Sequence, residues 1–171
     1  MLEEAINDLS KTPEPGPDCY ETGRRLQVGV LTNPLSGGNK KGLGELRSVL
    51  DKWPDVLHSE ASTPEDMTEV LHSFARNGVD LVVINGGDGT IHAVLTAIGR
   101  EEIFARPPLF SLLCAGTTSM LPLDVGIAGS PAAALPRILK WAESTDESLT
   151  ILSRPVLKVS RATQQPLLGM F

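Results

Sequence analysis

Short apolar runs alternate with segments of helical character from Leu26 onward, and this alternation is the strongest constraint on the fold. Four runs have the length and composition of strands, at 26–32, 56–61, 81–84 and 109–113. Helical segments follow them at 43–53, 63–78, 91–98 and 130–141. Strands that alternate with helices of this length predict an α/β fold, in which a mostly parallel sheet is covered by helices on both faces.

Two helix boundaries are strongly marked. The stretch Thr63-Pro64-Glu65-Asp66 combines a capping hydroxyl, a proline at the first helical position and acids near the positive end of the helix dipole. Asn77-Gly78 is typical of a helix end. Ser130-Pro131 predicts another helix start, although Pro136 lies inside that helix and predicts a kink or a later start.

Composition divides the chain into three parts. Residues 1–24 form an acidic tail and a proline-rich linker, 25–150 form the α/β domain, and 151–171 contain strand-like segments at 156–160 and 166–171. We expect these last segments to open a second domain whose remaining strands are missing. Their unpaired apolar edges would then favour self-association, for example as a homodimer.

Bulk properties exclude several classes of protein. Residues 1–20 contain five acids and one base, so they supply −4 of the net charge of −6 and leave about −2 on the other 151 residues. That balance is atypical of a nucleic-acid-binding protein. Cys19 and Cys114 form neither a disulfide framework nor a metal-binding spacing. With no signal peptide and no long apolar run, the sequence predicts a cytoplasmic protein.

Three loops rich in glycine or threonine follow the first, third and fourth predicted strands, at 33–42, 86–90 and 115–118. In parallel sheets, ligands bind at the carboxyl ends of the strands, where these loops would meet. Paired glycines let backbone N–H groups approach phosphate oxygens. The three loops together therefore predict a site for a phosphorylated ligand.

Asp88 is the unusual residue in these loops, since a carboxylate repels phosphate unless a metal or a proton-transfer step requires it. One interpretation is structural: a tight turn in which Asp88 is the helix N-cap. The first loop does not match the Walker A motif, because Leu43 stands where that motif has its lysine.

The stretches NPLSGG at 33–38 and GGDGT at 86–90 resemble the diacylglycerol kinase catalytic domain family. This superfamily includes sphingosine and ceramide kinases. NAD kinases share the second motif, but the first favours the lipid kinases. The resemblance implies a three-layer, Rossmann-like nucleotide-binding domain at 25–150, followed by a β-sandwich domain of which 151–171 are the opening strands. It also implies that the chain is a fragment that is inactive alone.

The resemblance further implies ATP and Mg²⁺ as cofactors, and a lipid alcohol such as diacylglycerol or a sphingoid base as the acceptor at a membrane surface. Asp88 would be the catalytic residue near the metal and the transferred phosphoryl group. Thr63 would offer its hydroxyl to the nucleotide or, equally well, only cap its helix. The residues implied in nucleotide binding are Asn33, Pro34, Ser36, Gly37, Gly38, Thr63, Gly86, Gly87, Asp88, Gly89, Thr90, Gly116, Thr117 and Thr118.

The chain departs from the family pattern at three positions. Relatives continue GGDGT with x-N-E, where this chain has Ile91-His92-Ala93, and they have asparagine where Ser119 stands. His92 is either a substitute polar contact or a solvated residue, and Lys40-Lys41 is either a phosphate clamp or a solvated loop. These departures leave an alternative open: a degenerate nucleotide-binding module with a regulatory role and no kinase activity.

Overall fold

The computed structural model describes residues 24–116, 127–144, 151, 156–161 and 164–169. Residues 1–23 of the predicted tail at 1–24, together with Thr117, Thr118 and Ser119, lie outside the described residues. Four strands form the central sheet: β1 (Val28–Thr32), β2 (Leu57–Glu60), β3 (Leu81–Gly86) and β4 (Leu109–Cys114). The helices are η1 (Asn39–Lys41), α2 (Gly44–Leu50), α3 (Pro64–Arg76), α4 (Asp88–Arg100) and α6 (Pro131–Glu143).

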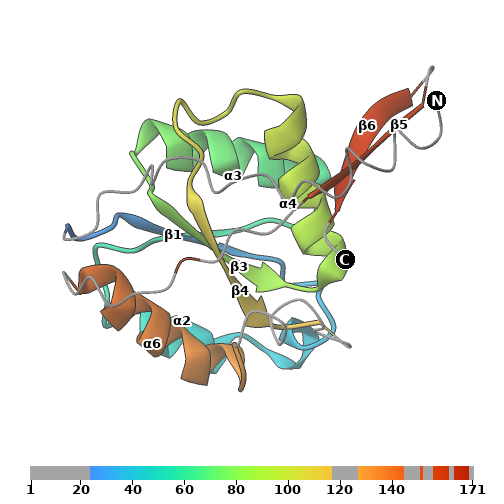
Figure 1. The fold of residues 1–171 in the computed structure, drawn as a ribbon. Coiled ribbons are helices and arrows are strands. Elements are labelled where there is room, and N and C mark those ends of the chain that lie inside the picture. Colours follow the sequence, from blue (N-terminus) through green and yellow to red (C-terminus); the bar gives the residue numbers. More distant parts are fainter. Residues whose placement is uncertain (1–23, 117–126, 145–150, 152–155, 162–163, 170–171) are drawn as a thin grey trace.

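The four strands are all parallel and lie in the order β2-β1-β3-β4 (Figure 1). Helices α3 and α4 cover one face and α2 and α6 cover the other. The predicted three-layer α/β fold is thus confirmed. The central strands β1 and β3 are buried on both faces, which explains why they are continuous apolar runs in the sequence.

Each face of the sheet has its own core. Phe74 on α3 is the largest fully buried side chain, and it packs in the core beneath α3 and α4. It lies so close to β1 that a Cβ on Gly29 would stand 2.8 Å from its ring. Leu135 and Leu139 on α6 occupy the opposite core together with residues of α2.

The ends of α2 and α4 differ from the sequence predictions, whereas the start of α6 agrees with the one predicted at Ser130-Pro131. Helix α2 ends at Leu50, because Trp53 already belongs to a turn in which its N–H donates to the Leu50 carbonyl. Helix α4 continues one residue past Gly99. Helix α6 begins at Pro131, with the Ser130 hydroxyl accepting from the Ala133 N–H, so the alternative of a later start is wrong.

Near the end of the chain, β5 (Leu157–Arg161) and β6 (Gln164–Gly169) pair antiparallel as a two-stranded sheet. The prediction that these segments have no strand partner is therefore wrong, because each pairs with the other. Strand β6 runs beside α4 (Figure 1). No helix among the described residues is long and apolar enough to cross a lipid bilayer.

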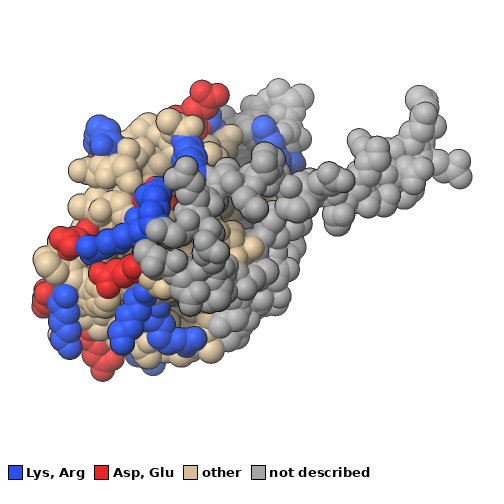
Figure 2. All heavy atoms as spheres, turned by 60° about the vertical axis from the view of Figure 1, so that its left-hand side comes forward, with Lys and Arg blue, Asp and Glu red and all other residues tan. Residues whose placement is uncertain are grey.

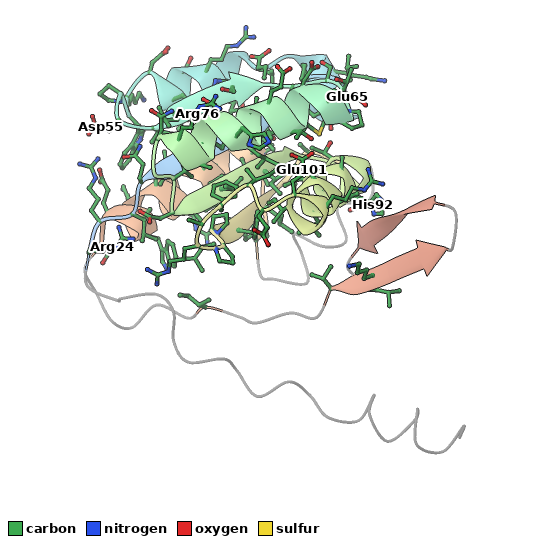
Figure 3. All side chains as sticks on the ribbon, turned by 90° about the horizontal axis from the view of Figure 1, so that it is seen from above. Arg24, Asp55, Glu65, Arg76, His92 and Glu101 are labelled. Carbon is green, nitrogen blue, oxygen red and sulfur yellow. The ribbon has the colours of Figure 1, made fainter. Side chains whose placement is uncertain are left out.

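The two edges of the sheet carry different groups. Figure 3 shows Arg24, Asp55 and Arg76 at the amino edge, and Glu65 and His92 at the carboxyl edge. At the amino edge, basic and acidic side chains lie side by side (Figure 2). There Arg24 forms two hydrogen bonds, of 2.9 and 2.6 Å, with the carboxylate of Asp80. Although burial opposes it, this pairing and a backbone N–H keep the pKa of Asp80 below its usual value.

Candidate functional site

The loops after β1, β3 and β4 meet at the carboxyl edge of the sheet, because these three strands are neighbours. The Gly38 N–H donates to the Ala115 carbonyl at 2.9 Å. A Cβ on Gly38 would lie 3.0 Å from that same oxygen, and one on Gly87 would lie 3.3 Å from the Cα of Gly116. All three loops are therefore in contact, and at these two glycines side chains would force them apart.

The polar side chains of the first loop join it to helix α4. Asn33 donates from Nδ2 to the Thr90 hydroxyl at 2.9 Å, while its Oδ1 accepts from the Leu35 N–H at 2.9 Å. The buried Ser36 hydroxyl accepts from the Gly87 N–H at 3.1 Å and lies 3.4 Å from the Thr90 hydroxyl. The two motifs of the sequence are thus held together by their own side chains.

Helix α4 does not begin as it would if Asp88 were its N-cap. Its N-cap is Gly87, whose carbonyl accepts from the N–H groups of Thr90 and Ile91, and Asp88 is the first helical residue. The interpretation of Asp88 as N-cap is therefore wrong. Gly86 lies in β3 rather than in the loop. Asp88 is exposed at the helix N-terminus, where the dipole favours a negative charge.

Two exposed glycines in these turns, Gly37 and Gly89, have backbone N–H groups that are available as donors. The N–H groups of Gly37 and Gly89 donate to no acceptor within the described part of the chain. Gly89 is in the first turn of α4, where N–H groups have no intrahelical partner and the helix dipole attracts anions. The first loop and α4 together therefore form a surface suited to phosphate oxygens.

Thr63 has a clear structural role. Its hydroxyl accepts from the Asp66 N–H at 3.1 Å, and the Asp66 carboxylate accepts from the Thr63 N–H at 3.1 Å, which completes a capping box. Hydrogen bonds from the Thr63 side chain and backbone hold the pKa of Asp66 below its usual value.

We expect Thr63→Ala to lower the free energy of unfolding by about 1 kcal/mol, because the Asp66 N–H loses its acceptor. Thr63→Ser retains the hydroxyl and should match the wild type. Urea denaturation measures both. If Thr63 only caps α3, the affinity for Mg·ATP is the same in both variants. A loss of affinity in Thr63→Ala alone, under conditions in which both variants are fully folded, would assign the hydroxyl to the nucleotide.

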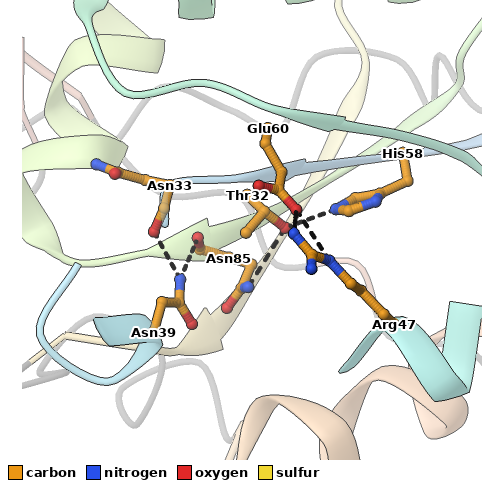
Figure 4. A network of polar contacts seen from close by, with 7 residues as sticks. All are labelled: Thr32, Asn33, Asn39, Arg47, His58, Glu60 and Asn85. Carbon is orange, nitrogen blue, oxygen red and sulfur yellow. Dashed lines mark hydrogen bonds and ion pairs between the residues drawn. The ribbon is translucent and has the colours of Figure 1, made fainter. Parts of the chain in front are cut away.

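A buried polar network lies beneath the first loop (Figure 4). The Thr32 hydroxyl contacts Asn85 Nδ2 at 3.3 Å and His58 Nε2 at 3.0 Å. The network includes Asn39, a buried residue of η1 that sequence reasoning did not select. Asn85 Oδ1 is buried and has no hydrogen-bond partner, so this network is polar but incompletely satisfied.

Burial lowers the pKa of His58, partly opposed by Glu60 and assisted by Arg47, which pairs with Glu60 at 2.6 Å. Since the folded state binds this proton less readily than the unfolded state, stability is complete above the unfolded pKa of about 6.5 and falls as the pH drops below it.

We therefore expect the free energy of unfolding to decrease between pH 7.5 and 5.5, and His58→Gln to reduce that slope. His72→Gln is the matched control, because His72 lies elsewhere and pairs with Glu101 at 2.9 Å. Urea titrations at several pH values measure the slope, and a slope unchanged by His58→Gln would contradict the assignment.

The side chains at this site suit a magnesium ion that is bound together with a phosphate group rather than by the protein alone. No group of three His, Cys, Asp or Glu side chains in the described residues could hold a metal alone. Mg²⁺ usually retains waters and binds one or two carboxylates together with substrate phosphates. Asp88, exposed beside the surface formed by the first loop and α4, is a carboxylate that could serve as one such ligand.

The other residues selected from the sequence lie in the first loop, in η1 and on α4. Pro34 follows Asn33 in the first loop. Lys40 and Lys41 are exposed in η1, and His92 is half-buried on α4. Ala93 is partly buried against the core beneath α3 and α4.

The sequence pattern of the "Diacylglycerol kinase catalytic domain" matches residues 27–149. The chain belongs to this family. Among its relatives, "Diacylglycerol kinase" of Mycobacterium tuberculosis is 28% identical over 131 residues, which cover 72% of this chain and 41% of that protein. "Probable lipid kinase YegS-like" of Stenotrophomonas maltophilia is 28% identical over 123 residues, 69% of this chain and 39% of that protein.

The crystal structure of a diacylglycerol kinase from Bacillus anthracis has the same fold as this chain, with a TM-score of 0.55. The two are 24% identical, and the match covers 71% of this chain and 41% of that one. The chain thus spans about two fifths of the length of the relatives it matches.

Proposed function

We propose that this chain is the nucleotide-binding part of an ATP-dependent lipid kinase that phosphorylates a lipid hydroxyl. One observation carries the proposal. Asn33 and Ser36 of the first motif bond directly to Thr90 and Gly87 of the second, beside the exposed N–H groups of Gly37 and Gly89. Family membership agrees with this assignment.

Phosphoryl transfer depends on positioning and charge neutralisation more than on covalent chemistry. In this proposal the N–H groups of Gly37 and Gly89 hold phosphate oxygens, and the N-terminus of α4 stabilises their charge. Gly38, Gly86 and Gly116 keep the backbones close enough for this. The proposed site also includes Thr117 and Thr118, which directly follow Gly116 in the sequence. Asp88 would hold Mg²⁺, which supplies positive charge to the transferred phosphoryl group.

The acceptor in this proposal is diacylglycerol or a sphingoid base, met at a membrane surface by a cytoplasmic protein. The alternative is a regulatory nucleotide-binding module. It is favoured by His92 and Ala93, because the family pattern that the two motifs resemble implies a carboxylate at position 93, where this chain has alanine.

The two functions are separated by a kinase assay on the protein expressed from its complete reading frame. We expect Mg²⁺-dependent transfer from radiolabelled ATP to diacylglycerol or sphingosine in mixed micelles. We expect residues 1–171 alone to bind Mg·ATP without transferring phosphate. Absence of lipid labelling by the complete protein, with Mg·ATP still bound, would support the regulatory alternative.

Self-association also belongs to the proposal. Leu157 and Val159 on β5 are about half exposed, at 51% and 49%, on a strand that already has β6 as a partner. Sedimentation of the wild type and of a Leu157→Lys variant tests whether this surface forms a homodimer.

A further inference from the structure

We propose that Asn39 is a positioning residue of the nucleotide site, which sets the shape of the first loop and thereby the place of the Gly37 N–H. This inference rests on the proposed function. Asn39 is 5% exposed, and it is the first residue of η1, directly after the glycine pair. Its side chain points inward, beneath the loop, toward the strand ends (Figure 4).

One nitrogen of Asn39 joins the ends of two strands. Nδ2 donates to the carbonyl of Asn33 at 2.8 Å and to that of Asn85 at 3.2 Å. Asn33 follows β1 directly and Asn85 lies near the end of β3, and the Asn33 N–H donates to the Asn85 carbonyl at 2.9 Å. The amide therefore anchors η1 to the point where both motif-bearing loops begin.

The backbone of Asn39 closes the loop on itself. Its N–H donates to the Ser36 carbonyl at 2.9 Å, and its carbonyl accepts from the Gly42 N–H at 2.9 Å. The neighbouring Gly38 N–H donates to the Ala115 carbonyl at 2.9 Å. Gly37 is thus a central residue of a turn whose two ends are fixed. It is exposed, and its N–H has no acceptor in the described residues.

Few other side chains can make this anchor. Bridging two carbonyl oxygens requires two hydrogens on one atom at the length of an asparagine side chain. Aspartate has the same shape but would place oxygen against both carbonyls and bury a charge. Alanine removes the anchor but leaves neither carbonyl without a hydrogen-bond donor. The Asn33 carbonyl still accepts from the Ser36 N–H, and the Asn85 carbonyl still accepts from the Asn33 N–H. Asn39→Ala should consequently fold.

The test compares Asn39→Ala with Asn77→Ala on the full chain. Asn77 also donates from Nδ2 to a backbone carbonyl, that of Ser73 at 2.8 Å, but it is exposed at the end of α3, away from the site. NMR titration with Mg·ATP should show about a tenfold weaker affinity for Asn39→Ala, as expected for one lost pair of hydrogen bonds, and no change for Asn77→Ala.

Hydrogen exchange gives the readout that a purely structural role would not move. With Mg·ATP, Asn39→Ala should keep protection at 86–90 and lose it at 33–38. Asn39→Ser, whose shorter side chain cannot bridge both carbonyls, should behave in the same way and replaces Asn39→Ala if that variant does not fold. Wild-type affinity together with wild-type protection in either folded variant would overturn the proposal.

The exchange experiment without nucleotide separates this proposal from the function on which it rests. Asn39→Ala should speed exchange of the Gly38 N–H even in the absence of Mg·ATP. If the wild type does not bind Mg·ATP but this acceleration is seen, the proposed function fails while the anchoring role of Asn39 stands. If exchange of Gly38 is unaltered, the anchoring role is wrong.

Discussion

Asp88→Asn, made in the protein expressed from its complete reading frame, is expected to lower the rate of phosphoryl transfer at least about a hundredfold, which corresponds to roughly 2.7 kcal/mol of transition-state stabilisation. The reason is that the amide cannot hold Mg²⁺ as the carboxylate does. Stability should change little, because the N-cap of α4 is Gly87 and Asp88 is an exposed first-turn residue whose charge is worth at most about 1 kcal/mol there.

Glu65→Gln is the matched control for this experiment. Glu65 is also an exposed acid in the first turn of a helix at the carboxyl edge of the sheet, in α3 (Figure 3). Initial rates with radiolabelled ATP should fall only in Asp88→Asn, while urea midpoints stay alike. Near-normal turnover in Asp88→Asn would contradict the proposed role of this carboxylate in holding Mg²⁺.

Gly86→Ala is expected to lower the free energy of unfolding by about 1–3 kcal/mol, the usual cost of overpacking a buried position. A Cβ there would lie 2.5 Å from Cβ and 2.6 Å from Oγ1 of Thr90. Thr90 cannot easily move aside, because its hydroxyl accepts from Asn33 Nδ2 and contacts Ser36. The substitution should therefore separate the two motifs and weaken Mg·ATP binding as well.

Gly89→Ala, three residues along, is the stability control. A Cβ on Gly89 would meet no atom within 4 Å, and the residue is helical. Alanine there should leave stability unchanged or raise it by up to about 1 kcal/mol. Equal stability of Gly86→Ala and Gly89→Ala in urea titrations would contradict the close approach of β3 to Thr90.

The layers of the fold were predictable because they depend on local patterns. Buried runs such as that of β3 and the start and end of α3 at Thr63 and Gly78 are encoded within a few residues, and the structure has them there. The helix start at Asp88 was less predictable. Glycine pairs allow several turn conformations, so the sequence did not show that Gly86 would remain in the strand and that Gly87 would be the cap.

The missed residues have partners that only the folded chain brings near. Asn39 bonds to carbonyls of Asn33 and Asn85, and Asn85 lies 46 positions away in the sequence. His58 acquires its lowered pKa by burial beside Thr32 on the neighbouring strand. Neither environment follows from a motif, because each depends on strand order. An asparagine directly after a glycine pair was the one available signal for Asn39.

The central claim is that the three loops form one nucleotide site, and hydrogen exchange with and without Mg·ATP tests it most directly. Because the chain spans about two fifths of its relatives, we expect weak binding, with a Kd of about 10⁻⁴ M or higher, equivalent to roughly −5.5 kcal/mol or less favourable. At saturating Mg·ATP, amides in 33–38, 86–90 and 116–118 should gain protection together. Protection confined to one of these loops would contradict the shared site.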